Sequence, residues 1–178
     1  MNGMKRLLDN SVFELIPMKT TLEKAEILPA GTKVSVTASP AKGMDATVDL
    51  VEQFVQMGLD VVPHISARLT KSKSELSEIV TRLDESGVSE IFVVGGDADD
   101  PGDFFDAMAL IRHLGTLDHP FTRIGVTGYP EGHPSIGDEL IIQALIDKEP
   151  FASSVTTQMC FDVEAIRSWI LRIRGLGI

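Results

Sequence analysis

The fold class of this chain is decided by residues 73–94, KSELSEIVTRLDESGVSEIFVV. Apolar residues recur there at positions i, i+3, i+4 and i+7, which is the stripe of an amphipathic helix: Leu76, Ile79, Val80 and Leu83. Gly87 is expected to end this helix. The apolar run 91–94 that follows is typical of a buried strand. The stretch therefore predicts one helix and one strand of a β/α unit.

The same alternation extends along the whole chain. Short apolar runs recur at the spacing of a strand, a helix and two loops, and we expect them to be strands: 12–16, 34–37, 61–65, 91–94, 124–127 and 155–161. Apolar stripes mark two of the helices between or after them: Val48, Val51 and Val55, and Ile166, Trp169, Ile170 and Ile173. Asp45 is expected to cap the first of these helices and Gly58 to follow its end. The pattern predicts a parallel sheet covered by helices.

Two architectures are possible for such a sheet, an open doubly wound sheet and a closed barrel. The first strand is followed by Pro17-Met18-Lys19-Thr20 in place of a Gly-x-Gly-x-x-Gly fingerprint, which disfavours the Rossmann fold. Polar residues at the carboxyl end of every strand favour a barrel. We therefore expect an α/β fold of the (β/α)8 TIM-barrel type with about six β/α units present, in a single domain over residues 1–178 that is truncated after the sixth unit.

Composition narrows the class of protein. An apolar content of 43% and a charged content of 24% are typical of a soluble globular domain. A net charge of -10 disfavours nucleic acid as a partner, because phosphate neutralisation needs clustered Lys and Arg. Cys160 is the single cysteine, and residues 1–10 resemble no signal peptide, so we expect a cytoplasmic protein. No apolar run approaches the ~20 residues of a membrane span.

Glu14 interrupts the first predicted strand, whose other residues are apolar. A carboxylate in a parallel strand is costly unless it is paired or protonated, because burial penalises its charged form. A buried, inward Glu14 would be a candidate general acid. The alternative is a glutamate on the outer side of the strand that pairs with a lysine.

Thr37 and His64 lie at the ends of the second and third predicted strands. The hydroxyl of Thr37 can contact a ligand, or it can bond to the backbone as strand threonines commonly do. His64 is either a ligand-contacting group or a satisfied structural histidine. No second His, Cys or carboxylate stands at metal-ligand spacing beside it, so we expect no metal site.

The fourth strand ends in Gly95-Gly96-Asp97. Glycines allow a flat ligand to approach the backbone closely, and the carboxylate can then bind the polar edge of a pyrimidine or pterin. The alternative is a plain turn, because Asp99-Asp100-Pro101-Gly102 follows at once. Sequence alone leaves both open.

The last two predicted strands also run into polar or aromatic groups. Tyr129 and His133 follow the fifth strand and could pack on a ring system, and the alternative for either residue is a surface position without a ligand. Gln158 stands in the run 155–161, and its amide matches the amide-like edge of a pterin. A core glutamine bonded to backbone is the alternative.

Six strand-end motifs, in chain order, resemble those of the methylenetetrahydrofolate reductases, a family of flavin-dependent (β/α)8 barrels. The motifs are Phe13-Glu14-Leu15-Ile16-Pro17, Ser35-Val36-Thr37, Pro63-His64-Ile65-Ser66, Gly96-Asp97, Tyr129-Pro130-Glu131-Gly132-His133-Pro134 and Thr157-Gln158-Met159-Cys160-Phe161-Asp162. They cover nearly the whole chain at barrel spacing.

The resemblance implies an oxidoreductase of one-carbon metabolism that reduces 5,10-methylenetetrahydrofolate to 5-methyltetrahydrofolate with NAD(P)H through bound FAD. Glu14 would be the general acid, Asp97 would lie near both flavin and folate, and Gln158 would bind the pterin. The implied cofactor-binding residues are Thr37, His64, Gly96, Asp97, Tyr129, His133 and Lys148, the last as the nearest counterpart of a phosphate-binding lysine. The implied partner is a small-molecule folate, and a homo-oligomer is compatible with it.

The chain departs from the family pattern on the flavin side. The family usually has an arginine at the position of Gly95 and an aromatic residue at that of Ala38. A non-redox folate-binding or methyl-transfer accessory protein on the same barrel is therefore the alternative function. An aldolase-type lyase would need a strand lysine for a Schiff base, and the six predicted strands contain none.

Overall fold

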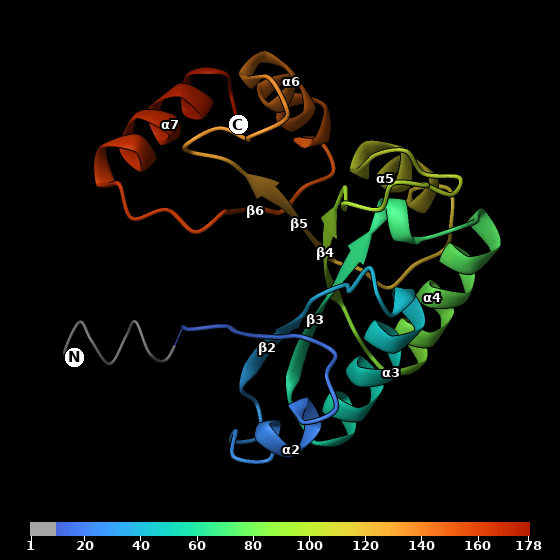
Figure 1. Ribbon diagram of the computed structural model, residues 1–178. Coiled ribbons are helices and arrows are strands. Elements are labelled where there is room, and N and C mark those ends of the chain that lie inside the picture. The colour runs from blue at the N-terminus through green and yellow to red at the C-terminus, as the bar shows by residue number, and fades with distance from the viewer. Residues whose placement is uncertain (1–9) are drawn as a thin grey trace.

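The computed structural model describes residues 10–178, in which parallel strands alternate with helices (Figure 1). Residues 1–9, on which the expected lack of a signal peptide largely rests, lie outside the described residues. The strands are β1 (Phe13–Leu15), β2 (Lys33–Val36), β3 (Asp60–Ser66), β4 (Glu90–Val94), β5 (Arg123–Gly128) and β6 (Ser154–Thr157). The helices are α2 (Thr21–Ala25), α3 (Gly43–Gln56), the 3-10 helix η1 (Ala67–Leu69), α4 (Lys73–Glu85), α5 (Ala107–Leu114), α6 (Asp138–Lys148) and α7 (Val163–Gly175).

The strands pair in chain order, from β1 to β6, and every pair is parallel. They form a curled sheet with the helices on its outer side (Figure 1). Within residues 10–178, β1 and β6 are the two edges of this sheet. The arrangement confirms the predicted partial (β/α) barrel. No helix in the described part of the chain is long and apolar enough to cross a membrane.

The apolar core lies between the sheet and the helices. Alternate strand residues point outward into it, because side chains of a strand alternate between the two faces. Fully or nearly fully buried examples from the central strands are Val34, Val36, Ile65, Ile91, Val93 and Val126. The other face of the sheet is left to line the inside of the curl.

The predicted helical stripe of residues 76–83 is confirmed, because all its members are buried in α4. Ser72 caps this helix, since its side chain accepts a hydrogen bond from the backbone N–H of Glu75 at 3.1 Å. The helix ends at Glu85, and Gly87 follows with a φ of 74°, as expected for a glycine just past a helix.

Three details of the prediction are wrong. Asp45 does not cap α3, which begins two residues earlier at Gly43; Asp45 lies in the first turn. Ile170 of α7 is 44% exposed, because that helix buries only Trp169 and Ile173. The last strand is Ser154–Thr157 and not 155–161, since β6 is an edge with a partner on one side only in the described sheet.

Candidate active site on the inner face of the sheet

The inner face of the sheet carries side chains in rows, because parallel pairing places residues of neighbouring strands side by side. One row contains His64 of β3, Phe92 of β4, Gly125 of β5 and Ser154 of β6. Glu14 of β1 is paired with Ser35 of β2, which is paired with Val62 of β3. Polar and aromatic groups therefore face the inside of the curl.

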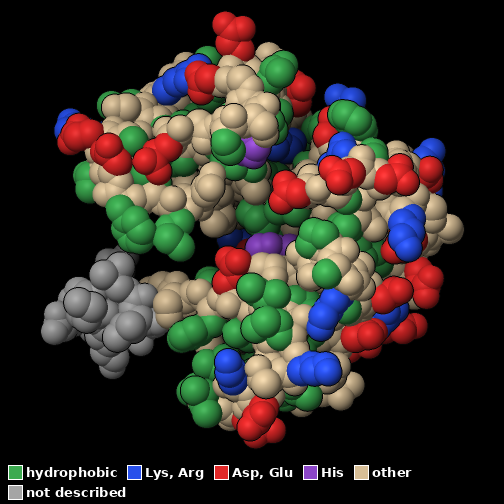
Figure 2. Space-filling model, viewed as in Figure 1, with side chains coloured by type: hydrophobic (Ala, Val, Ile, Leu, Met, Phe, Trp, Pro, Cys, Tyr) green, Lys and Arg blue, Asp and Glu red, His purple; other side chains and the backbone are tan. Residues whose placement is uncertain are grey.

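A cavity of about 790 Å³ lies against this inner face. Figure 2 shows the hollow at the centre of the molecule, with histidine side chains in it. The cavity brings together most of the residues that the sequence singled out: Glu14, His64, Asp97, Tyr129, His133 and Gln158. Its size falls in the range of pockets for cofactors and other small ligands, roughly 300–1,000 Å³. Thr37, Gly96 and Lys148 do not line it.

His64 and Phe92 form an aromatic wall of the cavity. Their ring centroids lie 4.7 Å apart with an angle of 48° between the planes. Gly125 makes room for this pair, since a Cβ there would lie 2.7 Å from Cδ2 of Phe92. Burial lowers the pKa of His64 to about 4, so its imidazole is neutral at physiological pH. The wall is therefore uncharged and suited to a flat ring.

The lowered pKa of His64 predicts a dependence of stability on pH. Between pH 6.5 and about 4 the unfolded chain binds a proton on His64 that the folded chain does not, so the free energy of unfolding falls as the pH falls. We expect a loss of about 2 kcal/mol between pH 6.5 and pH 5. Urea unfolding followed by the fluorescence of the single tryptophan, Trp169, measures it.

His64→Phe is the control for this prediction, because phenylalanine keeps a ring against Phe92 but does not titrate. The difference between wild type and variant isolates His64 from the carboxylates, which also titrate in acid. Parallel pH profiles for the two proteins would contradict the assignment.

Tyr129 and His133 lie in the loop after β5, and their rings meet edge to face with centroids 5.2 Å apart. The backbone N–H of Ser135 donates to Nδ1 of His133 at 3.2 Å. When the ring is neutral, its proton is therefore on Nε2. Both residues line the cavity, and their packing on a ring system stays a prediction.

Asp97 is exposed at the cavity and directly follows Gly96. Gly96 has a φ of 85°, and a Cβ there would overlap Oγ of Ser66. That hydroxyl is buried and has no hydrogen-bond partner in the described structure. Position 96 thus depends on glycine for two reasons, the backbone angle and the contact with Ser66.

Glu14 and Gln158 differ from expectation in their burial. Both were expected among apolar neighbours, and both are exposed in the structure while lining the cavity. The reason is that Glu14 lies on edge strand β1 and Gln158 follows edge strand β6. Only the backbone N–H of Gln158 is bonded, to the carbonyl oxygen of Gly128 at 2.8 Å. Its amide group is thus open to the cavity.

Thr37 and Lys148 are not brought to the cavity. The hydroxyl of Thr37 donates to Leu15 O at 3.5 Å, and the backbone N–H of Thr37 donates to the same oxygen at 3.0 Å. Lys148 is buried on α6, and burial lowers its pKa against the opposing charges of Asp106 and Asp147. The local bonding of Thr37 corresponds to its structural alternative.

A group of charged residues at the starts of three strands escaped sequence analysis. Nζ of Lys33 donates to Oε2 of Glu90 at 2.5 Å, and Nε of Arg123 lies 3.4 Å from the same oxygen. The sequence signal that could have found this group is a charged residue at the start of each of the strands β2, β4 and β5. The expectation that the strands contain no lysine is wrong, because β2 begins at Lys33. Its ion pair leaves no free amine for a Schiff base.

The cavity lining fits the ring part of a flavin better than its pyrophosphate. Neutral rings and hydroxyls, from His64, Phe92 and Thr127, suit an isoalloxazine. A pyrophosphate needs cations or helix N-termini. Lys33 is the one cation among the described residues that line the cavity, and it is bound to Glu90. No group of three potential metal ligands occurs within residues 10–178.

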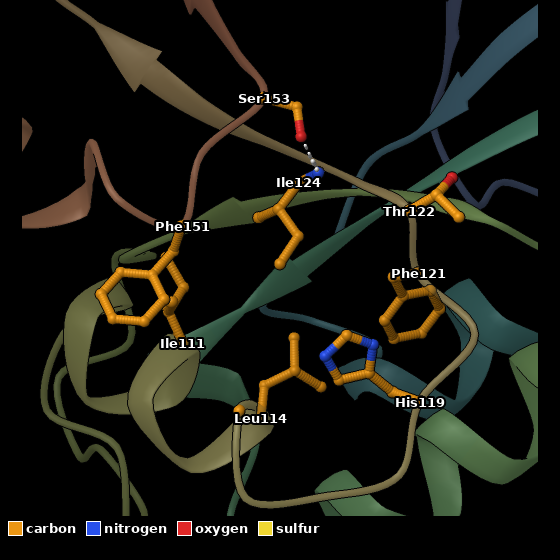
Figure 3. A pocket seen from close by; sticks show the side chains of 9 residues that line it. Ile111, Leu114, His119, Phe121, Thr122, Ile124, Phe151 and Ser153 are labelled. Atoms are coloured by element: carbon orange, nitrogen blue, oxygen red, sulfur yellow. Dashed lines mark hydrogen bonds between the residues drawn. The ribbon is translucent and has the colours of Figure 1, made fainter.

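A second cavity of about 240 Å³ lies at the amino ends of β5 and β6 (Figure 3). Ile111 and Leu114 of α5 form one side, and the stacked rings of His119 and Phe121, 5.4 Å apart, form another. It contains no residue of the predicted site. Barrels of this type place their chemistry at the carboxyl ends of the strands, so we assign the candidate site to the larger cavity.

Two comparisons with known proteins bear on the identity of the chain. The family model described as methylenetetrahydrofolate reductase matches residues 14–178. Methylenetetrahydrofolate reductase 1 of Schizosaccharomyces pombe is 27% identical over an alignment that covers 72% of this chain and 23% of that protein. The chain thus spans less than a quarter of the length of this curated relative.

Proposed function

Because this chain belongs to the methylenetetrahydrofolate reductase family, we propose that it reduces 5,10-methylenetetrahydrofolate to 5-methyltetrahydrofolate, using NADH or NADPH and bound FAD. One observation carries the proposal. Glu14, Asp97 and Gln158 come from distant parts of the chain and line the same cavity, beside the ring wall of His64 and Phe92. An acid, a polar clamp and a ring surface are what this substrate needs.

Glu14 is proposed as the general acid. Its protonated carboxyl gives a proton to the bridging nitrogen of the substrate, the C–N bond breaks, and its electron pair stays on that nitrogen. The remaining carbon becomes an iminium that accepts a hydride. The exposure of Glu14 lets the carboxylate regain a proton from water after each turnover.

Asp97 and Gln158 are proposed to hold the pterin. The carboxylate of Asp97 accepts hydrogen bonds from ring N–H groups, and the open amide of Gln158 offers one donor and one acceptor to an amide-like edge. Both side chains lie just past the carboxyl ends of strands, Asp97 after β4 and Gln158 after β6. They thereby orient the substrate toward Glu14.

A flavin, when bound, would supply hydride transfer between the nicotinamide and the folate. His64 and Phe92 would support its rings, with Tyr129 and His133 at the edge of the cavity. Gly96, Thr37 and Lys148 do not line the cavity, so their positions do not support a contact with the cofactor.

A second function is favoured by one observation. The single cation of the described lining, Lys33, is held in an ion pair, so the cavity offers no free charge for a pyrophosphate. This favours a non-redox folate-binding or methyl-transfer accessory protein.

An absorption spectrum of the purified protein, with and without NADH, tests the two functions. For the reductase we expect a flavin spectrum that bleaches with NADH and returns when methylenetetrahydrofolate is added, with methyltetrahydrofolate as product. A colourless protein that takes up no added FAD, binds folate and forms no methyltetrahydrofolate would contradict the reductase and support the accessory protein.

A further inference from the structure

Arg68 lies outside the predicted site, in η1 directly after β3, and its hydrogen bonds all go to the segment that follows β4. Its own backbone N–H donates to Gly95 O at 2.9 Å. That carbonyl belongs to the residue two positions before Asp97. The end of β3 is thus bonded to the start of the Asp97 loop, which we define as residues 95–106.

The guanidinium of Arg68 reaches further along the same loop. Nε donates to Ala98 O at 2.6 Å, Nη2 to Asp99 O at 3.2 Å, and Nη1 to Phe105 O at 3.3 Å. Its Cζ also lies 5.1 Å from the ring centroid of Phe105. The rigid fork of a guanidinium can satisfy several acceptors at once, which an ammonium cannot.

The acceptors show what this arginine does. Acidic residues are frequent in the loop, yet Arg68 donates to carbonyl oxygens and forms no ion pair with described residues. Carbonyl contacts fix the course of a backbone and do not neutralise a side chain. The carboxylate of Asp97 stays free to face the cavity. The carbonyl oxygens of Gly95, before it in the loop, and Ala98, after it, both accept hydrogen bonds from Arg68.

Other contacts hold only the far part of the loop. Asp103 donates its backbone N–H to Lys71 O at 3.0 Å, and Phe104 is buried. For residues 96–101, Arg68 makes the only hydrogen bonds within the described chain. This part has no helix or strand of its own, so little else restrains it.

We propose that Arg68 is a positioning residue that holds the Asp97 loop against β3 and so orients the Asp97 carboxylate toward the substrate. The orienting role rests on the proposed function of Asp97, whereas the holding of the loop does not. A group misplaced by about 1 Å can lower the reaction rate ~10²-fold, so loss of the guanidinium should lower the rate by displacing Asp97.

NMR relaxation and kinetics of the whole protein test the proposal. In Arg68→Ala we expect the order parameters of amides 96–100 to fall below about 0.6, the range of flexible backbone, and kcat/KM for methylenetetrahydrofolate to fall ~10–100-fold. Added methylguanidinium should restore part of both. Arg68→Lys, which keeps the charge, should resemble Arg68→Ala because it cannot bond three carbonyls. Arg82→Ala, which removes an arginine bonded to Asp49 and Glu52 on α3, is the matched control and should leave the loop unchanged.

A double-mutant cycle with Asp97→Asn separates positioning from general destabilisation. If Arg68 acts through Asp97, Arg68→Ala should cost less than about threefold once Asp97 is already replaced. Unchanged order parameters of amides 96–100, or full additivity in the cycle, would overturn the proposal. A protein without reductase activity would instead contradict the proposed function, and the relaxation measurement would still decide whether Arg68 holds the loop.

Discussion

Glu14→Gln is expected to slow the reduction of methylenetetrahydrofolate by ~10²–10⁴-fold, the usual contribution of a general acid. The amide is nearly isosteric with the carboxylic acid but cannot deliver a proton to the departing nitrogen. Binding should change little, because Glu14 is exposed and its side chain forms no hydrogen bond within residues 10–178 that would be lost. Single-turnover measurement of methyltetrahydrofolate formation is the direct assay.

Oxidation of NADH with an artificial electron acceptor separates the acid role from a role in cofactor binding. That reaction needs no proton for an amine, so Glu14→Gln should leave it within about twofold of wild type. Glu78→Gln on α4 is the matched control, because Glu78 is exposed on the outer side of the molecule. Equal slowing of both reactions would show that Glu14 positions the cofactor or the strand and is no general acid.

Gly96→Ala is expected to lower the free energy of unfolding by about 2–4 kcal/mol. A φ of 85° is strained for any residue with a Cβ, by roughly 1–2 kcal/mol, and overlap with Oγ of Ser66 adds to that cost. Because the residue precedes Asp97, kcat/KM for the folate should fall as well. Urea unfolding and steady-state kinetics measure the two effects.

Two further variants divide the expected cost of Gly96→Ala into its causes. Gly87 has a φ of 74° but open space around it, so Gly87→Ala measures the backbone term alone, about 1 kcal/mol. Ser66→Ala removes an unpartnered hydroxyl and should be nearly neutral alone, yet it should recover part of the loss in combination with Gly96→Ala. If Gly96→Ala costs no more than Gly87→Ala, the contact with Ser66 carries no energy.

Local pattern was enough to predict most of the fold. The stripe of residues 76–83 and the stop at Gly87 follow from helical periodicity and from the conformations open to glycine, which neighbours in sequence determine. The parallel order of the strands follows from their apolar character and from the helices between them. The residues at the strand ends were found because polar groups interrupt apolar runs there.

Relations between strands could not be read in the same way. That His64 faces Phe92 depends on the register of β3 against β4, and the ion pair of Lys33 with Glu90 depends on the curl of the sheet across β3. The predicted burial of Glu14 was wrong because Glu14 lies on an edge strand, where burial depends on what lies beyond the edge of the sheet. The bonds of Arg68 join segments about 30 residues apart, for which one sequence holds no signal.

Residues of each strand alternate between the core and the inner face of the sheet. In β4, Val93 is completely buried in the core, while Phe92 and Val94 on either side of it line the cavity. One position must therefore pack in the apolar core, and the next can contact a ligand. Substitutions on the inner face can retune what the protein recognises without disturbing the packing that keeps it folded, so such a strand is free to evolve new specificities at every second residue.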